Sequence, residues 1–228
     1  MSIVLAAKCG PKENILADIL RANIHAVELF LSGEMFKDLN GIISVCKNFS
    51  FRYALHAPLD DFNPTALAHL TEALEAEIVT FHDIYWEDEW FKLIDIFKPV
   101  KAKLCIENIG NVHSPLKFMR RYGLGRCLDL EHLQFEISGV FVDEFINVIK
   151  QSSHIHLTGY YSGSQFWHTH IHHSPEHGKF MLDLIKRAGY SGFVVSEARI
   201  EYQTYDEFKK LYDYYQHWKS LSKDALEL

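Results

Sequence analysis

The chain has 228 residues, a formal net charge of −7 and 48% hydrophobic residues, a composition typical of a folded globular protein. The excess of acidic residues disfavours a broad nucleic-acid-binding surface, which would need a basic patch. No apolar run is long enough to cross a bilayer, so we expect no membrane partner. The four cysteines show no CxxC spacing, and we therefore expect reduced thiols in a cytoplasmic protein.

Short apolar runs typical of buried strands alternate with segments of helical periodicity along the chain, with no long linker between them. The predicted strands are Ile3–Ala7, Ala26–Phe30, Arg52–Ala57, Glu77–His82, Lys103–Glu107, Arg126–Leu130, His154–Leu157 and Phe193–Glu197. The predicted helices are Lys12–Ala22, Glu34–Lys47, Pro64–Ala76, Glu87–Lys98, Pro115–Tyr122, Val140–Lys150, Lys179–Ala188 and Thr204–Lys219.

Apolar strands that alternate with amphipathic helices predict a parallel sheet covered on its outer face. Eight such units in a chain of this length indicate a closed (β/α)8 barrel. We therefore predict an α/β protein with one TIM-barrel domain over residues 1–228. The alternative is an open doubly wound sheet. Against it, no GxGxxG or Walker motif follows the first strand, and we expect no nucleotide cofactor.

Each of seven predicted strands is apolar until its end, where a side chain that can bind a metal ion stands. Strand C-termini converge on one face of a (β/α)8 barrel, so these side chains would meet in one pocket. Burying so many ionisable groups together is costly unless they are paired or bind a metal. We therefore predict a metal site at this face. The strand-end residues are Glu28, His56, His82, Glu107, Asp129, His132, His156 and Glu197.

The tract His154–His177 holds seven of the fourteen histidines of the chain. Short His-rich tracts are typical of metal binding, and a solvated loop is the alternative. Within this tract we expect His156 to be a primary ligand, because it ends a strand, and His154 to be structural. The loop histidines further along either cover a site with a single metal or hold additional metals.

The chain resembles the xylose isomerase-like (β/α)8 superfamily, which includes sugar isomerases and epimerases and the AP-endonuclease branch. The resemblance covers nearly the whole chain and rests on the ordered motifs LHAPL, IVTFHD, CIEN, CLDLEH, HIHLTG and VVSEA. For the isomerase and epimerase branches it implies that the substrate contacts His132. It also implies a single metal, held by Glu107, Asp129, His156 and Glu197.

For the AP-endonuclease branch the resemblance implies three zinc ions, with additional ligands at His56, His82 and His132. It also implies a loop pair Asp-x-His, which is best matched by His170-Ile171-His172, so a histidine stands where an aspartate is expected. His168-Thr169-His170 is a competing register. A set so rich in imidazole favours Zn²⁺ or Fe²⁺, while its carboxylates also suit Mn²⁺, and we expect one to three ions.

Two catalytic functions fit this site. The first is a metal-dependent isomerase or epimerase of a sugar or sugar phosphate, in which the metal polarises a hydroxy-carbonyl group. Glu107 and Glu197 would then transfer protons, with His132 as the third catalytic residue. The second is a multinuclear zinc phosphoesterase of the AP-endonuclease type, and a non-catalytic metal- or ligand-binding barrel is a third possibility. The expected partner is a small molecule, a carbohydrate or its phosphate.

We predict substrate contacts from two aromatic and two basic residues near strand ends. Tyr160 and Trp167 follow the seventh predicted strand, where they would stack on a sugar ring or pack within their own loop. Lys8 and Arg199 would contact a phosphate group or form surface salt bridges. The Tyr-rich last helix is either a face that covers the barrel or a homodimer contact.

Overall fold

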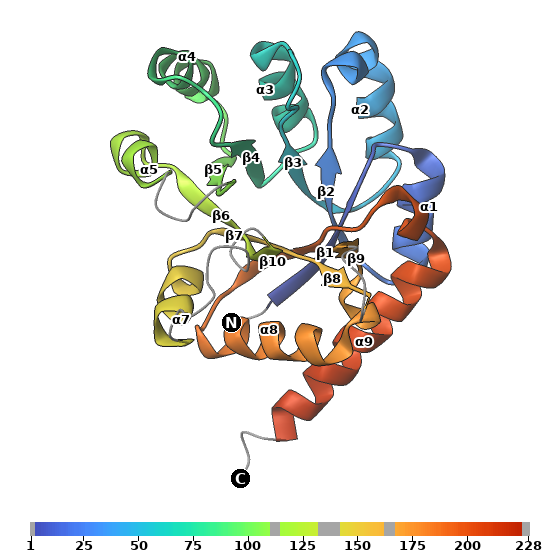
Figure 1. Cartoon of the computed structure of the whole chain (residues 1–228). Coiled ribbons are helices and arrows are strands. Elements are labelled where there is room, and N and C mark those ends of the chain that lie inside the picture. Colours follow the sequence, from blue (N-terminus) through green and yellow to red (C-terminus); the bar gives the residue numbers. More distant parts are fainter. Residues whose placement is uncertain (1–2, 110–114, 132–141, 162–166, 225–228) are drawn as a thin grey trace.

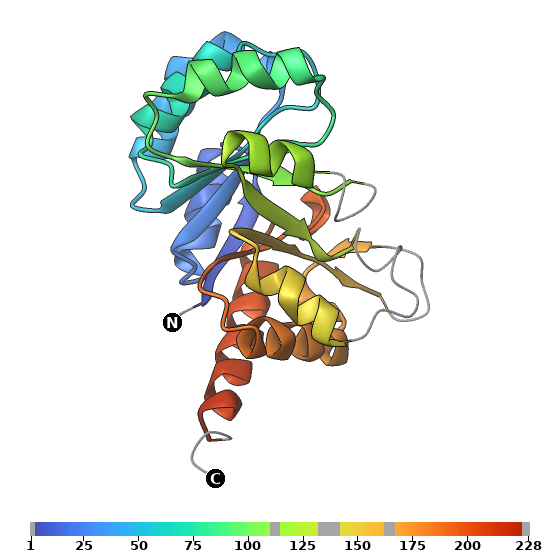
Figure 2. The same ribbon diagram turned by 90° about the vertical axis from the view of Figure 1, so that its left-hand side faces the viewer.

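The computed structural model describes residues 3–109, 115–131, 142–161 and 167–224 (Figure 1). Eight parallel strands form a closed barrel in the order β1-β10-β7-β6-β5-β4-β3-β2, and the helices lie around its outside (Figures 1 and 2). The predicted (β/α)8 fold is therefore confirmed. The barrel strands are β1 Ile3–Cys9, β2 Ala26–Phe30, β3 Arg52–His56, β4 Ile78–His82, β5 Lys103–Glu107, β6 Gly125–Asp129, β7 His154–Leu157 and β10 Gly192–Ser196.

The helices alternate with the strands, as the periodicity predicts. The first and last of them, α1 and α9, pack against each other beside β1. None of the described helices is both long and apolar enough to span a bilayer. The α-helices are α1 Glu13–Arg21, α2 Leu39–Lys47, α3 Pro64–Ala73, α4 Glu87–Phe97, α5 Leu116–Tyr122, α7 Val142–Lys150, α8 Pro175–Arg187 and α9 Tyr205–Asp224, and the short 3-10 helices are η1 Gly33–Asp38, η2 Ile171–His173 and η3 Ile200–Tyr202.

Several helix boundaries differ from the prediction, and two of the differences have a clear physical reason. The segment expected as one helix over 34–47 is divided into η1 and α2, because the Asp38 side chain accepts a hydrogen bond from the Gly41 N–H and caps α2 there. Helix α8 begins at Pro175 and not at Lys179, since proline is favoured in the first turn of a helix.

A small antiparallel sheet between β7 and α8 was not predicted. It pairs β8 (Gly159–Tyr160) with β9 (Trp167–Thr169), and these strands are too short to give a periodic signal. Gly159 has no room for a side chain, because a Cβ there would lie 2.5 Å from the carbonyl oxygen of His170. The sheet thus fixes the path of the histidine-rich loop.

The barrel interior is built in layers. Its apolar layer comprises Ala6, Ala26, Ala54, Ile78, Cys105, Cys127, Phe193 and Val195. Side chains on one face of a strand recur every second residue. On each of the seven strands that supply this layer, the next inward residue is polar and stands nearer the C-terminal mouth. These polar residues are Lys8, Glu28, His56, Thr80, Glu107, Asp129 and Glu197.

Strand pairing holds this polar layer in register. Lys8 is opposite Glu28, and Asp129 is opposite His156, which follows His154 by the same two-residue step. The main hydrophobic core lies between the outer barrel surface and the helices. The polar side chains occupy the interior of the barrel above its apolar layer.

Candidate metal centre at the barrel mouth

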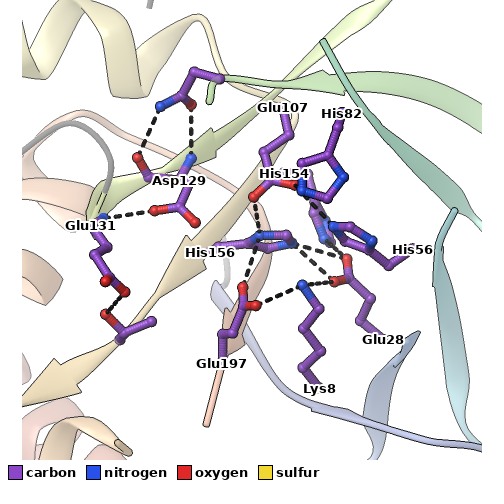
Figure 3. A network of polar contacts seen from close by, with 12 residues as sticks. Lys8, Glu28, His56, His82, Glu107, Asp129, Glu131, His154, His156 and Glu197 are labelled. Atoms are coloured by element: carbon purple, nitrogen blue, oxygen red, sulfur yellow. Dashed lines mark hydrogen bonds and ion pairs between the residues drawn. The ribbon is translucent and has the colours of Figure 1, made fainter. Parts of the chain in front are cut away.

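Four side chains from neighbouring strands converge at the C-terminal mouth of the barrel (Figure 3). They are Glu107, Asp129, His156 and Glu197, whose potential ligand atoms all lie within 4.8 Å of one another. Nδ1 of His156 lies 2.9 Å from Glu107 Oε1 and 3.3 Å from Glu197 Oε2. Three carboxylates and one imidazole are a donor set that suits a divalent transition metal. The residues present therefore fit the predicted ion.

A buried carboxylate orients His156. Glu28 is fully buried, and its carboxylate lies 3.0 Å from His156 Nε2 and 2.5 Å from His154 Nε2. Burial opposes ionisation of Glu28, but the two histidines and Lys8 hold its pKa well below its usual range. A histidine that binds a metal usually donates its other N–H to a carboxylate. Glu28 can act in this way and leave His156 Nδ1 facing the other carboxylates.

Asp129 is fixed mainly through its backbone. The Asn108 side chain donates to the Asp129 carbonyl oxygen over 3.2 Å and accepts from the Asp129 N–H over 2.9 Å. The Glu131 N–H donates to Asp129 Oδ1 over 2.7 Å. These contacts hold the end of β6 beside β5 and set the direction of the Asp129 carboxylate.

A second ligand group adjoins the first and shares Glu107 with it. Glu107 Oε2 lies 2.9 Å from His56 Nε2 and 3.3 Å from His82 Nε2, while Oε1 faces His156. Burial opposes the charge on Glu107, but His156 and His56 hold its pKa well below the usual range. Burial also lowers the pKa of His82 to about 4, so its imidazole is neutral at pH 7 and can act as a ligand.

Lys8 lies within this network and is almost fully buried. Its Nζ is 2.9 Å from Glu197 Oε1 and 3.6 Å from Glu28 Oε1. Burial favours the neutral amine, but Glu197 and Glu28 raise the pKa of Lys8 above its ordinary value. Lys8 was predicted as a substrate contact. The structure places its ammonium as a fixed positive charge beside Glu197.

A cavity of about 460 Å³ adjoins this network. Its lining includes the polar residues Lys8, Glu197 and Arg199 and the apolar residues Ile15, Phe30 and Ile200. His168 also lines it, with a left-handed backbone (φ 62°) that is uncommon for a residue with a side chain. The Glu197 side chain is 21% exposed, whereas that of Glu107 is 2% exposed, so Glu197 is the accessible carboxylate.

The two predicted loop ligands, His170 and His172, lie outside both ligand groups. His170 is buried between Ser196 Oγ, 2.8 Å from its Nδ1, and the Tyr202 carbonyl oxygen, 3.2 Å from its Nε2. His172 Nε2 lies 3.1 Å from Glu207 Oε2 on helix α9. The β8–β9 sheet and η2 direct this loop toward α9, away from the interior of the barrel.

The other predicted contacts have different surroundings. Tyr160 and Trp167 pack on each other across the small sheet, with ring centroids 5.1 Å apart, and both also contact His177. Arg199 lines the cavity, and its backbone N–H donates to the carbonyl oxygen of His168 over 2.9 Å. His132 lies outside the described residues.

Sequence reasoning missed several residues that shape these sites. Asn108 directly follows Glu107 in the CIEN motif, and Glu131 stands two residues after Asp129, so both could have been found from their neighbours. Glu207 could not, because an acidic residue in the first turn of a helix is ordinarily explained by the helix dipole.

The fold and this site define a (β/α)8 barrel with a polar ligand group at its mouth. No protein-family model and no curated protein matches the chain. Among solved structures it is similar to D-allulose 3-epimerase from Methylomonas sp., with 10% identity, a TM-score of 0.66 and coverage of 95% of this chain and 98% of that one. It is also similar to phosphoribosyl anthranilate isomerase from Thermotoga maritima, with 8% identity, a TM-score of 0.57 and coverage of 95% and 100%. At such identities the likeness shows the (β/α)8 fold alone.

Proposed function

We propose that the protein is an enzyme, a metal-dependent isomerase or epimerase of a small carbohydrate or its phosphate. The observation that carries this proposal is the convergence of Glu107, Asp129, His156 and Glu197 beside a cavity of about 460 Å³. A divalent ion held by these residues would polarise the hydroxy-carbonyl group of the substrate and acidify the adjacent C–H. A similar barrel was solved in complex with D-allulose, which supports a small carbohydrate as the substrate class.

Glu197 is the residue best placed to remove the proton, because it is the carboxylate that faces the cavity. Burial opposes its ionisation, but Lys8 and His156 hold the pKa of Glu197 below its usual range. It is therefore a carboxylate at neutral pH and can accept the proton from carbon, leaving an enediolate. A positioned base of this kind contributes about 10²–10⁴ in rate.

The proton, now on Glu197, would return to the adjacent carbon and so isomerise the sugar. Epimerisation needs a proton from the other face of the same carbon. Glu107 on β5, three strands from β10 around the barrel, would supply it after taking up a proton from solvent, while Glu197 releases its own proton to solvent. Lys8 would contribute its ammonium to stabilise the negative oxygen that develops in between.

A multinuclear zinc phosphoesterase is the second candidate, because Glu107 is shared between two ligand groups. One group adds His56 and His82 to Glu107, and the other adds Asp129, His156 and Glu197, so these residues would hold two ions, which would stabilise the negative charge of a phosphate. Against this candidate, His170 and His172 are turned away from the groups that they would extend. The net charge of −7 also disfavours a nucleic-acid substrate. A non-catalytic ligand-binding barrel has no specific observation in its favour.

Metal content and substrate turnover, measured on the same untagged protein, separate these candidates. We expect elemental analysis to find a transition metal in the wild-type protein and to find it lost in Asp129→Asn. We expect chromatography to detect epimerisation or isomerisation of D-allulose and related ketohexoses, free or phosphorylated. Hydrolysis of bis-(p-nitrophenyl) phosphate, together with two metal equivalents lost on mutation of Glu107→Gln, would support the phosphoesterase. Binding of no metal at all at the mouth would overturn both.

A further inference from the structure

A separate group of potential ligands lies where the histidine-rich loop meets the last helix. His172 and His173 of η2 face Glu207 in the first turn of α9, and one potential ligand atom from each lies within 4.8 Å of the others. Glu207 Oε2 lies 2.6 Å from His173 Nε2 and 3.1 Å from His172 Nε2. Two consecutive histidines thus direct the same ring nitrogen at one carboxylate oxygen.

The surroundings of His172 leave its hydrogen-bonding capacity unused. Its side chain is only 11% exposed, yet neither ring nitrogen makes a hydrogen bond of normal geometry with the described residues. A buried imidazole without such a partner costs free energy. An ion bound between His172 Nε2 and Glu207 would offset this free-energy cost, because the nitrogen lone pair would coordinate the ion.

Two members of the group, His172 and Glu207, are in the protonation states that a metal ion needs. Burial and the neighbouring His173 lower the pKa of His172 to about 4, so its imidazole is neutral at pH 7. Burial opposes ionisation of Glu207, but hydrogen bonds from Lys210 and His173 bring its pKa down to about 2. Neutral imidazole and ionised carboxylate are the ligand forms that bind metals.

The group is also partly accessible to solvent. The three side chains are 11–15% exposed, so water can reach the group. Lys210 Nζ lies 2.9 Å from Glu207 Oε1, which leaves Oε2 to face the histidines. The rings of Tyr161 and Tyr202 pack against His173, with centroids 4.7 Å and 5.4 Å away, and hold it in place.

We propose that His172, His173 and Glu207 form a second binding site for a divalent transition metal ion of the Zn²⁺ class, separate from the barrel mouth. Two imidazoles and one carboxylate, completed by water, are a donor set that suits zinc. The bound ion links η2 to α9 and so fastens the loop after β9 to the C-terminal helix. This site requires neither the proposed activity nor the metal at the barrel mouth.

The test is a calorimetric titration of the chelator-treated full chain with ZnCl₂, compared across matched variants. Loss of a residue that only hydrogen-bonds to a metal ligand lowers metal affinity by roughly 10–100-fold. We expect His173→Ala and Glu207→Gln each to lower the zinc affinity of one site by more than this, because each removes a ligand. The controls His217→Ala and Asp206→Asn, exposed on the same helix, should leave that site unchanged. Glu197→Gln, at the barrel mouth, should also retain it.

Thermal unfolding in EDTA checks that each variant is folded. Should His173→Ala not fold, Glu207→Gln preserves the shape of the side chain and carries the test alone. Co²⁺ gives an independent readout, because its visible absorption band from this site should be lost in Glu207→Gln and kept in Glu197→Gln. The proposal is overturned if Glu207→Gln binds zinc with the stoichiometry and affinity of the wild type, or if Glu197→Gln loses this site.

Discussion

The protein has two groups of histidines, and they differ in how they are brought together. In the barrel, each histidine contacts a buried carboxylate from another strand: His56 and His82 contact Glu107, and His154 and His156 contact Glu28. In the loop after β7, the histidines lie in three different environments. His168 lines the cavity, His170 binds Ser196, and His172 and His173 face Glu207.

Strand register explains this difference. Parallel strands fix which inward side chains lie at the same height, so residues far apart in sequence meet at the barrel mouth. Residues of the loop after β7 have no such constraint, so His168, His170 and the pair of His172 and His173 face three different sets of partners. A high local count of histidines is therefore a weaker indication of one metal site than single polar residues at equivalent strand positions.

Glu197→Gln tests the barrel group most severely. We expect turnover to fall by about 10²–10⁴ and the metal at the mouth to bind more weakly, because the substitution removes both the proposed base and one ligand. The fold should be retained, since glutamine has the same shape and Glu197 is partly exposed. Kinetics and elemental analysis measure these effects.

The matched control is Glu201→Gln, which changes an exposed carboxylate in η3. It should leave turnover and metal content at the wild-type level. Full activity of Glu197→Gln with an unchanged metal content would show that the barrel group is not the catalytic site.

Glu28→Ala tests whether the buried network supports the barrel itself. We expect the free energy of unfolding to fall by about 3–5 kcal/mol, because breaking a buried ion pair leaves an uncompensated charge. Here Lys8 would lose one of its two carboxylates, and His154 and His156 would lose their common partner. Urea denaturation of the metal-free protein measures the change.

A surface ion pair of the same protein provides the comparison. Glu77→Ala removes the carboxylate that pairs with Arg52, and both of these side chains are nearly half exposed. Exposed pairs contribute about 0–1 kcal/mol, so the loss should be several-fold smaller. Equal losses for Glu28→Ala and Glu77→Ala would mean that the buried network adds no more stability than a surface pair.

The barrel fold and the ligand-competent strand ends could be predicted from sequence because both follow from a two-residue period. The alternation that buries Ala26 and Cys105 in one layer also directs Glu28 and Glu107 inward in the next. The surroundings of Lys8 could not be predicted, since sequence does not distinguish a buried ammonium between two carboxylates from one at the surface.

The loop could not be predicted for a different physical reason. The positions of His170 and His172 depend on the small β8–β9 sheet, which no periodic pattern reveals, and on the close approach at Gly159. Their partners Ser196 and Glu207 lie more than twenty residues further along the chain. Only the folded arrangement shows that these two neighbouring histidines serve different contacts.

His170 provides the mildest test, through the pH dependence of stability. Burial and the adjacent His172 lower the pKa of His170 to about 3 from the ordinary 6.5. The unfolded chain therefore takes up a proton near pH 6.5 and the folded protein does not, so stability is present above that pH and is lost as the pH falls. Between pH 6.5 and 5 this loss reaches about 2 kcal/mol at most.

His170→Asn should remove this part of the pH dependence, even if it lowers stability at pH 7.5. Urea denaturation in EDTA at a series of pH values measures the slope. The pKa of His82 is also lowered, so His82 changes the slope in the same direction as His170. The quantity to compare is therefore the difference in slope between variant and wild type. His69→Asn, exposed on α3, should keep the wild-type slope. The contacts of His170 with Ser196 and Tyr202 imply that its imidazole is isolated from solvent. An unchanged slope in His170→Asn would contradict this, because it would show that the imidazole is protonated to the same extent in the folded and the unfolded chain.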